Sequence, residues 1–387
     1  MEILRLEPDE QGIVAWPTLS EDKRAVVTIG SFDGVHRGHQ AVLARAVELA
    51  HTHDVPSVAI TFDPRPGVVH AGIERDTQAV MSLDQRLELM DQAGFDYALV
   101  VRYTLAFAAR TYIFFLGQLV GKLGMRTLVL GSDATMGKGR EGDIAAIRKL
   151  SGATGVFELD VVDDFGPAGI YLPREVQYVV PEAGYEGANG LENGVKSGIE
   201  SGMKSEPSNP LTGMTKAQLR AWSKKQRSVA VREYSSSMVR FLLARGCVRD
   251  AAEILGRAHS IDATVVHGQA RGRELGFPTA NMADIRGFVP VDGVYAGYLT
   301  VLGSGERSGE RYAAAISVGV NSTFEQDGAR FVEVYCLDVP EGFDIYNASV
   351  RVEFVSYLRP MVAFEGAEAL VEQMKRDVDT AREALEA

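Results

Sequence analysis

The stretch Gly30-Ser31-Phe32-Asp33-Gly34-Val35-His36-Arg37-Gly38-His39 joins two segments of different character. Before it, residues 25–30 form an apolar, β-rich run that predicts a buried strand, and after it residues 40–50 place apolar side chains at helical spacing. Backbone N–H groups and the positive end of a helix dipole meet at such a strand-to-helix turn. The stretch therefore predicts a phosphate-binding site in an α/β domain.

Two glycines and two histidines support this interpretation. Gly34 and Gly38 let a phosphate approach the backbone closely. His36 and His39, three residues apart at the helix start, can direct both imidazoles at one polyphosphate and offset charge as pyrophosphate leaves. A histidine pair alone is usually a coincidence of the surface, but here it occurs together with the glycines and the turn, which favours a function.

Strands and helices continue to alternate up to residue 162. Residues 58–62, 97–101, 127–131 and 156–162 are further candidate strands, and residues 111–123 are a candidate helix. Ser82 has the character of an N-cap for another helix, which Gly94 would end. This order predicts a doubly wound, mostly parallel sheet that binds its ligand at the carboxyl ends of the strands.

Composition excludes several classes of protein. The 387 residues, 46% of them hydrophobic and 24% charged, allow two or three ordinary globular domains. The 40 basic and 52 acidic residues give a net charge of −12 without any basic run, so we expect no nucleic-acid partner and no membrane partner. Cys247 and Cys336 fit neither a disulfide framework nor a zinc cluster, and no apolar stretch is long enough to span a membrane, so we expect a cytoplasmic protein. The oligomeric state stays open, a homo-oligomer included.

The pattern of the chain changes twice in its second half. Residues 181–210 are rich in Gly, Ser, Glu and Asn, which predicts a disordered low-complexity insertion; the alternative is a weak helix formed on a partner. Helical patterns return at residues 215–227 and at 238–255, where Gly256 would end the helix. Short alternating runs then predict a small antiparallel β-barrel, closed by a C-terminal helix from residue 367 to about 385.

The motif GxFDGxHxGH at residues 30–39 resembles the signature of the HxGH nucleotidylyltransferases, in the form typical of bacterial FAD synthetases. The resemblance implies a Rossmann-like α/β domain in which the phosphate of FMN attacks the α-phosphate of ATP, so that catalysis is positioning and electrostatics. It implies catalytic roles for His36 and His39. It implies nucleotide contacts at Gly30, Phe32, Asp33, Gly34 and Gly38.

Three other segments are similar to the same family. Asp133 lies in residues 131–137, which resemble G-x-[DN]-F-x-F-G with Ala134 and Met136 in place of two phenylalanines. Residues 62–66 resemble F-x-P-H-P, with Arg65 where histidine is usual. Residues 235–240 resemble S-S-T-x-[IV]-R. That last resemblance implies nucleotide contacts from Ser236, Ser237 and Arg240, although an ordinary serine-capped helix would have the same pattern.

The run Gly268-Gln269-Ala270-Arg271-Gly272-Arg273-Glu274-Leu275-Gly276-Phe277-Pro278-Thr279-Ala280-Asn281 resembles the riboflavin kinase motif almost letter for letter. The resemblance implies an ATP site made by Gly272, Arg273, Gly276, Phe277, Pro278, Thr279 and Asn281. The glycines permit a backbone arch around phosphates, and Thr279 and Asn281 offer neutral oxygens to Mg²⁺. A Walker A lysine is missing, which excludes a P-loop kinase.

Glu333 is the candidate base of the kinase reaction. Strand alternation places it on one face with Phe331 and Tyr335. Riboflavin kinases have their catalytic glutamate in such a strand, which implies that Glu333 deprotonates the riboflavin 5′-hydroxyl. The alternative is an outward-facing glutamate on a one-sided strand. Weaker similarities lie at residues 319–324, at 345–347 and at Arg359.

Both resemblances together predict an FMN adenylyltransferase domain at residues 1–257 and a riboflavin kinase domain at 258–387. The substrates would be ATP, riboflavin and FMN, with Mg²⁺ as the metal cofactor. Two rivals remain: a riboflavin kinase whose adenylyltransferase domain is inactive, and a flavin-binding or regulatory module without turnover. Intact His36, His39 and Glu333 favour the two-reaction enzyme.

Overall fold

The structure, a computed structural model, describes residues 1–163, 171–172, 229–230, 234–267, 278–320, 330–340, 343–362 and 367–386. The predicted insertion at 181–210 and the predicted helix at 215–227 lie outside these residues.

The first half of the chain folds around a six-stranded parallel sheet with the order β1-β4-β3-β2-β5-β8. Its strands are β1 (Glu2–Leu6), β2 (Ala25–Ile29), β3 (Ser57–Phe62), β4 (Tyr97–Val101), β5 (Met125–Gly131) and β8 (Glu158–Val162). Because β3 and β5 lie on opposite sides of β2, the strand order reverses at β2, and ligands bind such sheets at this point. The doubly wound sheet is confirmed. Of the six strands of this sheet, only β1 was not predicted from the sequence, because this edge strand lacks the buried apolar run of the other strands.

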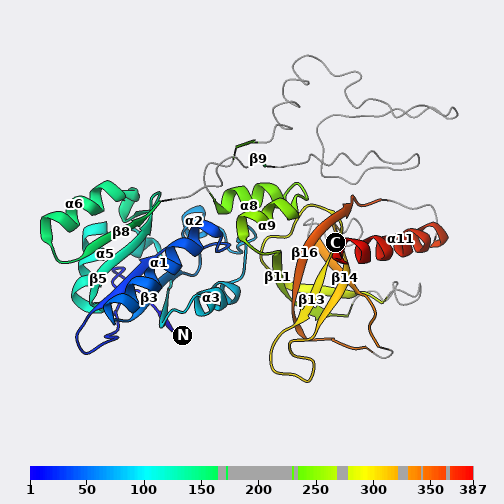
Figure 1. The fold of residues 1–387 in the computed structure, drawn as a ribbon, viewed down its shortest axis with the longest axis horizontal. Coiled ribbons are helices and arrows are strands. Elements are labelled where there is room, and N and C mark those ends of the chain that lie inside the picture. The colour runs from blue at the N-terminus through cyan, green and yellow to red at the C-terminus, as the bar shows by residue number, and fades with distance from the viewer. Residues whose placement is uncertain are drawn as a thin grey trace, which may run out of the picture.

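Helices cover both faces of the sheet (Figure 1). They are α1 (Arg37–His53), α2 (Pro66–Ala71), α3 (Leu83–Gln92), α4 (Leu105–Ala108), α5 (Tyr112–Gln118) and α6 (Ile144–Thr154). Successive strand residues face opposite sides, so Val26 packs in the core beneath α1 and α3, and Val27 packs in a second core with α5. As predicted, Ser82 caps α3, with its hydroxyl accepting the Gln85 N–H at 3.1 Å.

Several short helices and strands also occur in the part of the chain before residue 236. They are η1 (Leu119–Leu123), η2 (Lys138–Arg140), β6 (Thr135–Met136), β7 (Gly142–Asp143), β9 (Tyr171–Leu172) and β10 (Val229–Ala230). β6 pairs with β7, and β9 pairs with β10, each as an antiparallel ribbon.

Two helices, α8 (Ser236–Leu243) and α9 (Val248–Leu255), replace the single helix predicted at 238–255. The chain turns between them at Gly246, whose φ of 75° lies in the left-handed region that favours glycine. A Cβ at Gly246 would also lie 2.9 Å from the Tyr357 ring. The apolar pattern continues through the turn because both helices bury side chains in the same core, and sequence spacing alone cannot separate them.

The second half is a closed antiparallel barrel with the order β11-β12-β15-β14-β13-β16, which confirms the prediction. Its strands are β11 (His259–Val266), β12 (Ala280–Arg286), β13 (Gly293–Val301), β14 (Arg311–Val320), β15 (Arg330–Cys336) and β16 (Ser349–Arg359). The C-terminal helix α11 (Ala367–Glu386) lies against the barrel, where Asp377 binds Arg359 of β16 through two hydrogen bonds of 2.7 and 2.6 Å.

One core joins the barrel to α8 and α9. Leu242 and Ile254 from these helices are buried in the same cluster as Ile316 and Phe354 of the barrel. Figure 1 shows α8 and α9 between the parallel sheet and the barrel. By packing, therefore, the two helices belong with the barrel.

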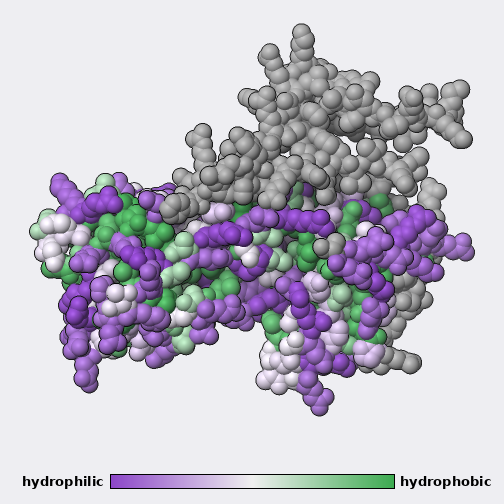
Figure 2. Space-filling view, viewed as in Figure 1, coloured by the Kyte–Doolittle hydropathy of each residue, from purple (hydrophilic) through white to green (hydrophobic). Residues whose placement is uncertain are grey.

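Hydrophilic side chains cover much of the face shown in Figure 2, with hydrophobic ones between them. Of the helices within the described ranges, none combines the length and the apolar character that crossing a bilayer requires.

Candidate functional site

A cleft of about 850 Å³ opens at the carboxyl end of the parallel sheet. Its walls come from the loop between β2 and α1, from the segments after β3, β4 and β5, and from the start of α8. The predicted nucleotide-site residues that line it are Gly30, Phe32, Asp33, His36, Gly38, His39, Asp133, Ser236, Ser237 and Arg240. Gly34 lies in the same loop but faces the other way, where a Cβ would meet Val80 at 3.1 Å.

His36 and His39 stack in the wall of the cleft, with ring centroids 3.7 Å apart. His36 is the N-cap of α1: its Nδ1 accepts the backbone N–H of His39 at 3.4 Å, so the helix begins at Arg37, earlier than the predicted residue 40. Phe32 packs edge-on against His39. The fold thus brings together the two imidazoles that the motif predicted.

Both imidazoles are neutral near pH 7. Burial, helped by the nearby Arg257 guanidinium, lowers the pKa of His36 to about 4. Burial also holds the pKa of His39 well below its usual value, with His36 and Arg86 adding to the effect. His39 Nδ1 is buried and has no hydrogen-bond partner among the described residues. A bound polyphosphate would raise both pKa values, because an opposite charge favours the protonated form.

The loop that carries the motif has an unusual backbone. Phe32, Gly34 and Val35 have φ angles of 46°, 82° and 39°. A left-handed angle is unfavourable for a β-branched residue such as Val35, so the surroundings must hold the loop in place. The Val35 carbonyl accepts hydrogen bonds from Gln40 at 2.8 Å and from Arg257 at 3.1 Å, and the Gly34 carbonyl accepts one from Arg257 at 2.6 Å.

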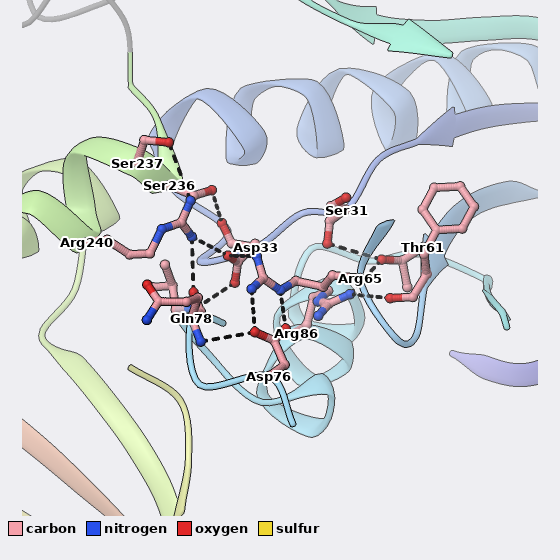
Figure 3. Close-up of polar contacts among 12 residues, drawn as sticks. Ser31, Asp33, Thr61, Arg65, Asp76, Gln78, Arg86, Ser236, Ser237 and Arg240 are labelled. Carbon is pink, nitrogen blue, oxygen red and sulfur yellow. Dashed lines mark hydrogen bonds and ion pairs between the residues drawn. The ribbon is translucent and has the colours of Figure 1, made fainter. Parts of the chain in front are cut away.

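Asp33 is the centre of a polar network with Arg65, Arg240 and Ser236 (Figure 3). Its side chain is 4% exposed, and one carboxylate oxygen lies 2.9 Å from Arg65 and 2.8 Å from Arg240. The other oxygen accepts the Val80 N–H at 2.8 Å, and the Asp33 carbonyl accepts the Ser236 hydroxyl at 2.7 Å. The carboxylate that the motif assigned to nucleotide binding is therefore already occupied by two guanidinium groups.

Arg65, which replaces the usual histidine, connects two carboxylates. Besides Asp33 it binds Asp76 through two hydrogen bonds of 2.5 and 2.6 Å, and Figure 3 shows the pair side by side. Hydrogen bonds and the charge of Arg65 outweigh burial and lower the pKa of Asp76. Asp76 was not predicted as a site residue, because no local pattern distinguishes it from other acidic loop residues.

An aromatic cluster lines the other side of the cleft. Phe62, Tyr103 and Phe107 contact one another with ring centroids 5.4 to 6.0 Å apart. Ala134 and Met136, which replace two phenylalanines of the family motif, line the same cleft and pack against the same core. Tyr103 and Phe107 were missed, although aromatic residues directly after the predicted strand at 97–101 could have signalled a binding surface.

The serine motif begins α8. The Ser235 hydroxyl accepts the Met238 N–H at 3.2 Å and caps the helix. For Ser235, the alternative of an ordinary serine-capped helix is therefore correct. Ser236 and Arg240 turn instead toward Asp33, and Arg240 also lies 3.4 Å from the Ser237 hydroxyl. The motif therefore joins the cleft at the same point as the histidine loop.

A second candidate site lies on the barrel around Glu333. Val332, Val334 and Cys336 of β15 are buried in the barrel core, whereas Glu333 is partly exposed with Phe331 and Tyr335. The predicted alternation is confirmed. Burial raises the pKa of Glu333.

The neighbours of Glu333 in the barrel are polar. Backbone register places it opposite Asn281 of β12 on one side and Ser317 of β14 on the other. Thr279 lies two residues before Asn281, next to Pro278. The other predicted ATP residues of this half, Gly272, Arg273, Gly276 and Phe277, lie outside the described residues, as do residues 321–324.

Two weaker matches acquire a structural explanation. Asn347, where riboflavin kinases usually have glycine, has a φ of 62°, an angle that asparagine tolerates better than most residues. Arg359 binds Asp377 and the Pro360 carbonyl, so its guanidinium anchors α11.

Comparison with known proteins divides the chain into the same two halves. The family model of FAD synthetase matches residues 18–172, and that of riboflavin kinase matches residues 255–385. Proteins named bifunctional riboflavin kinase/FMN adenylyltransferase are similar over nearly the whole chain. That of Pseudomonas fluorescens is 30% identical, covering 94% of this chain and 93% of its own, and that of Listeria monocytogenes is 28% identical, covering 93% and 92%.

A solved structure shows a similar fold over the whole chain. A crystal structure of a protein titled macrolide-efflux protein, from Streptococcus pneumoniae, covers 99% of both chains with a TM-score of 0.67 and 22% identity. At this identity the similarity concerns the fold.

Proposed function

Because the chain belongs to the family of bifunctional riboflavin kinases and FMN adenylyltransferases, we propose which of its residues perform each reaction. The kinase reaction transfers the γ-phosphate of ATP to riboflavin and gives FMN and ADP. In the adenylyltransferase reaction, FMN attacks the α-phosphate of ATP and gives FAD and pyrophosphate. The substrates are ATP, riboflavin and FMN.

We assign the adenylyltransferase reaction to the cleft of the parallel sheet. The observation that supports it best is the stacked pair His36 and His39 at the N-terminus of α1, beside the glycine-containing loop. The ATP phosphates would lie there, near the unpartnered Nδ1 of His39. Both histidines start neutral, so they would take up a proton or donate a hydrogen bond as charge develops on the leaving pyrophosphate.

Arg65 and Arg240 would guide the anionic groups of the substrates. Both line the cleft, and their shared partner Asp33 holds the two guanidinium groups near one point. Asp33 would therefore act on the nucleotide through its backbone and through these two arginines. The FMN ring would stack on the aromatic cluster of Phe62, Tyr103 and Phe107, which would compensate for the phenylalanines missing at 134 and 136.

We assign the kinase reaction to the face of the barrel that carries Glu333. Its partly buried carboxylate, opposite Asn281, would accept the proton of the riboflavin 5′-hydroxyl as oxygen attacks the γ-phosphate. Residues 272–281 would bind ATP beside it, as their motif implies.

The donors around Glu333 fit a magnesium ion. The Thr279 hydroxyl and the Asn281 amide each offer a neutral oxygen, the ligand atom that Mg²⁺ prefers, and Asn281 is the neighbour of Glu333 in register. A magnesium ion bound by Thr279 and Asn281 would screen the charge of the ATP phosphates. These residues would also hold the ATP so that its γ-phosphate faces the hydroxyl that Glu333 deprotonates.

We propose that the reactions divide the chain at residue 257, with adenylyl transfer in 1–257 and phosphoryl transfer in 258–387. The family matches at 18–172 and 255–385 support this division. We also propose that the protein acts in the cytoplasm, which the free thiols Cys247 and Cys336 and the use of ATP in both reactions support.

Incubation with riboflavin, ATP and Mg²⁺, followed by chromatography of the flavins, tests the assignment. Accumulation of FMN and then FAD is the expected result. FMN alone would favour the rival with an inactive adenylyltransferase domain, and unchanged riboflavin would favour a module without turnover.

A further inference from the structure

Arg257, the first residue after α9 and its Gly256 cap, reaches from the helices that pack on the barrel to the loop between β2 and α1. Its guanidinium donates hydrogen bonds to three backbone carbonyls: Gly34 at 2.6 Å, Val35 at 3.1 Å and Leu255 at 3.0 Å. No carboxylate pairs with it among the described residues, so its charge faces carbonyl oxygens rather than an acid. Five fixed N–H groups in one plane suit arginine to bind several carbonyls at once.

The two carbonyls that Arg257 binds outside its own segment belong to the strained part of the histidine loop. Val35 has a left-handed φ of 39°, and such a conformation persists only where the surroundings fix it. His36 follows directly, so the position of the Val35 carbonyl sets the position of the first imidazole. Gln40 holds the same carbonyl from α1, but among the described residues only Arg257 also binds the Gly34 carbonyl.

The charge of Arg257 acts on His36 as well. It lowers the pKa of His36 beyond what burial does. His39 stacks on His36 and is itself held neutral by burial. The charged groups nearby bind other partners: Arg86 binds the Thr61 hydroxyl, Arg37 binds the Glu253 carbonyl, and Asp33 binds Arg65 and Arg240. Arg257 is therefore the cation whose removal would alter the imidazole.

We propose that Arg257 is a positioning residue for adenylyl transfer, which fixes the Gly34–Val35 backbone and thereby holds His36 in place. The proposal rests on the proposed adenylyltransferase function. It makes one side chain, at the end of the two helices that pack on the barrel, a condition for the reaction in the cleft of the parallel sheet. The kinase reaction, on the barrel face around Glu333, does not depend on it.

Two substitutions separate the geometric role of Arg257 from its electrostatic role. Arg257→Met removes both the planar N–H groups and the positive charge. Arg257→Lys keeps the positive charge but removes the planar arrangement of N–H groups. Displacement of a reacting group by about 1 Å can cost on the order of 100-fold in rate, so we expect kcat for FAD formation from FMN to fall about 100-fold in both variants, with smaller changes in KM. FMN formation from riboflavin should stay within about twofold of wild type.

The pH profile distinguishes the two variants. In Arg257→Met the acid limb of FAD formation should move to higher pH, because His36 regains part of its ordinary basicity; in Arg257→Lys it should stay. Arg286→Met is the matched control, since Arg286 also crosses between the halves but binds the exposed Asp84 and leaves the loop untouched. It should change neither reaction.

Wild-type protein that forms no FAD would defeat the proposed function itself. If wild type forms FAD, an unchanged kcat in Arg257→Lys would overturn the positioning role, and an equal loss of both reactions in a folded variant would do the same. If Arg257→Met does not fold, Arg257→Lys decides the question. Its rate of FMN formation then shows whether the variant is folded.

Discussion

Asp33 and Arg240 are 207 residues apart in the chain, yet a carboxylate oxygen of Asp33 lies 2.8 Å from the Arg240 guanidinium. The same oxygen binds Arg65, so one buried carboxylate connects the histidine loop with α2 and α8. An aspartate that a motif assigns to nucleotide binding thereby becomes a structural centre of the cleft.

Asp33→Asn should destabilise the protein and slow FAD formation. Two guanidinium groups would lose the carboxylate that compensates them, and removing one partner of a buried ion pair costs about 3 kcal/mol or more. Urea unfolding measures the loss, and Asp22→Asn, at an exposed loop position, is the control. An unchanged unfolding midpoint would show that the pairs contribute nothing.

Glu333→Gln should abolish FMN formation and spare FAD formation from added FMN. Loss of a general base costs roughly 100-fold or more in rate. Glu353→Gln is the matched control, since Glu353 also lies on a barrel strand but pairs with Arg311. If a folded Glu333→Gln variant lost both reactions, the assignment of separate sites would be wrong.

As the pH is lowered, the rate of FMN formation should begin to fall at a higher pH than it would if the base were a glutamate with its usual pKa. Burial raises the pKa of Glu333, and only the deprotonated carboxylate can accept the hydroxyl proton. The pH dependence of kcat/KM for riboflavin, which reports the groups of the free enzyme, should show an acid limb above the usual glutamate pKa of about 4.3. A limb at or below that value would contradict the role of Glu333 as base.

Mild acid should destabilise the fold through buried histidines. Burial is the main cause that lowers the pKa of His259 to about 4 in the native state, whereas a histidine in the unfolded chain has a pKa near 6.5. Between these two pH values the unfolded chain binds a proton that the native state does not bind. The stabilising contribution of His259 is therefore present above pH 6.5 and is lost as the pH falls toward 4, roughly 2 kcal/mol of it by pH 5.

The variant His259→Gln isolates this effect. Urea unfolding at pH 7 and pH 5 should show a smaller acid loss in His259→Gln than in wild type, whereas His53→Gln, at an exposed position, should behave as wild type does. Equal acid losses in all three proteins would refute the explanation.

Arg65→His restores the residue that the family usually has and should weaken FMN use. A histidine is too short to bind Asp33 and Asp76 together, and near neutral pH it is mostly uncharged. We expect KM for FMN to rise about tenfold, the effect of about 1.4 kcal/mol, with FMN formation unaffected. Arg75→His, at an exposed position in the next loop, is the control; a KM equal to wild type would exclude Arg65 from substrate binding.

Local patterns predicted the elements that bury apolar side chains, such as β3 and α3, and the two imidazoles that meet in the cleft. They could not predict β1, whose side chains are largely exposed. They also could not predict contacts made by distant segments. Asp76 and Arg257 look ordinary in the sequence, because their roles depend on which loop the fold places opposite them.

The shared core of α8, α9 and the barrel affects how the protein can be divided for expression. A kinase fragment that begins at residue 258 would expose the apolar barrel surface that Leu242 and Ile254 cover. Exposed apolar surface of this kind promotes aggregation. A fragment that begins before Ser235 keeps that surface covered and retains the helix cap. The complementary fragment, ending before Ser235, would lose Arg240 and Arg257 together, so that its histidine loop would have no support from this side.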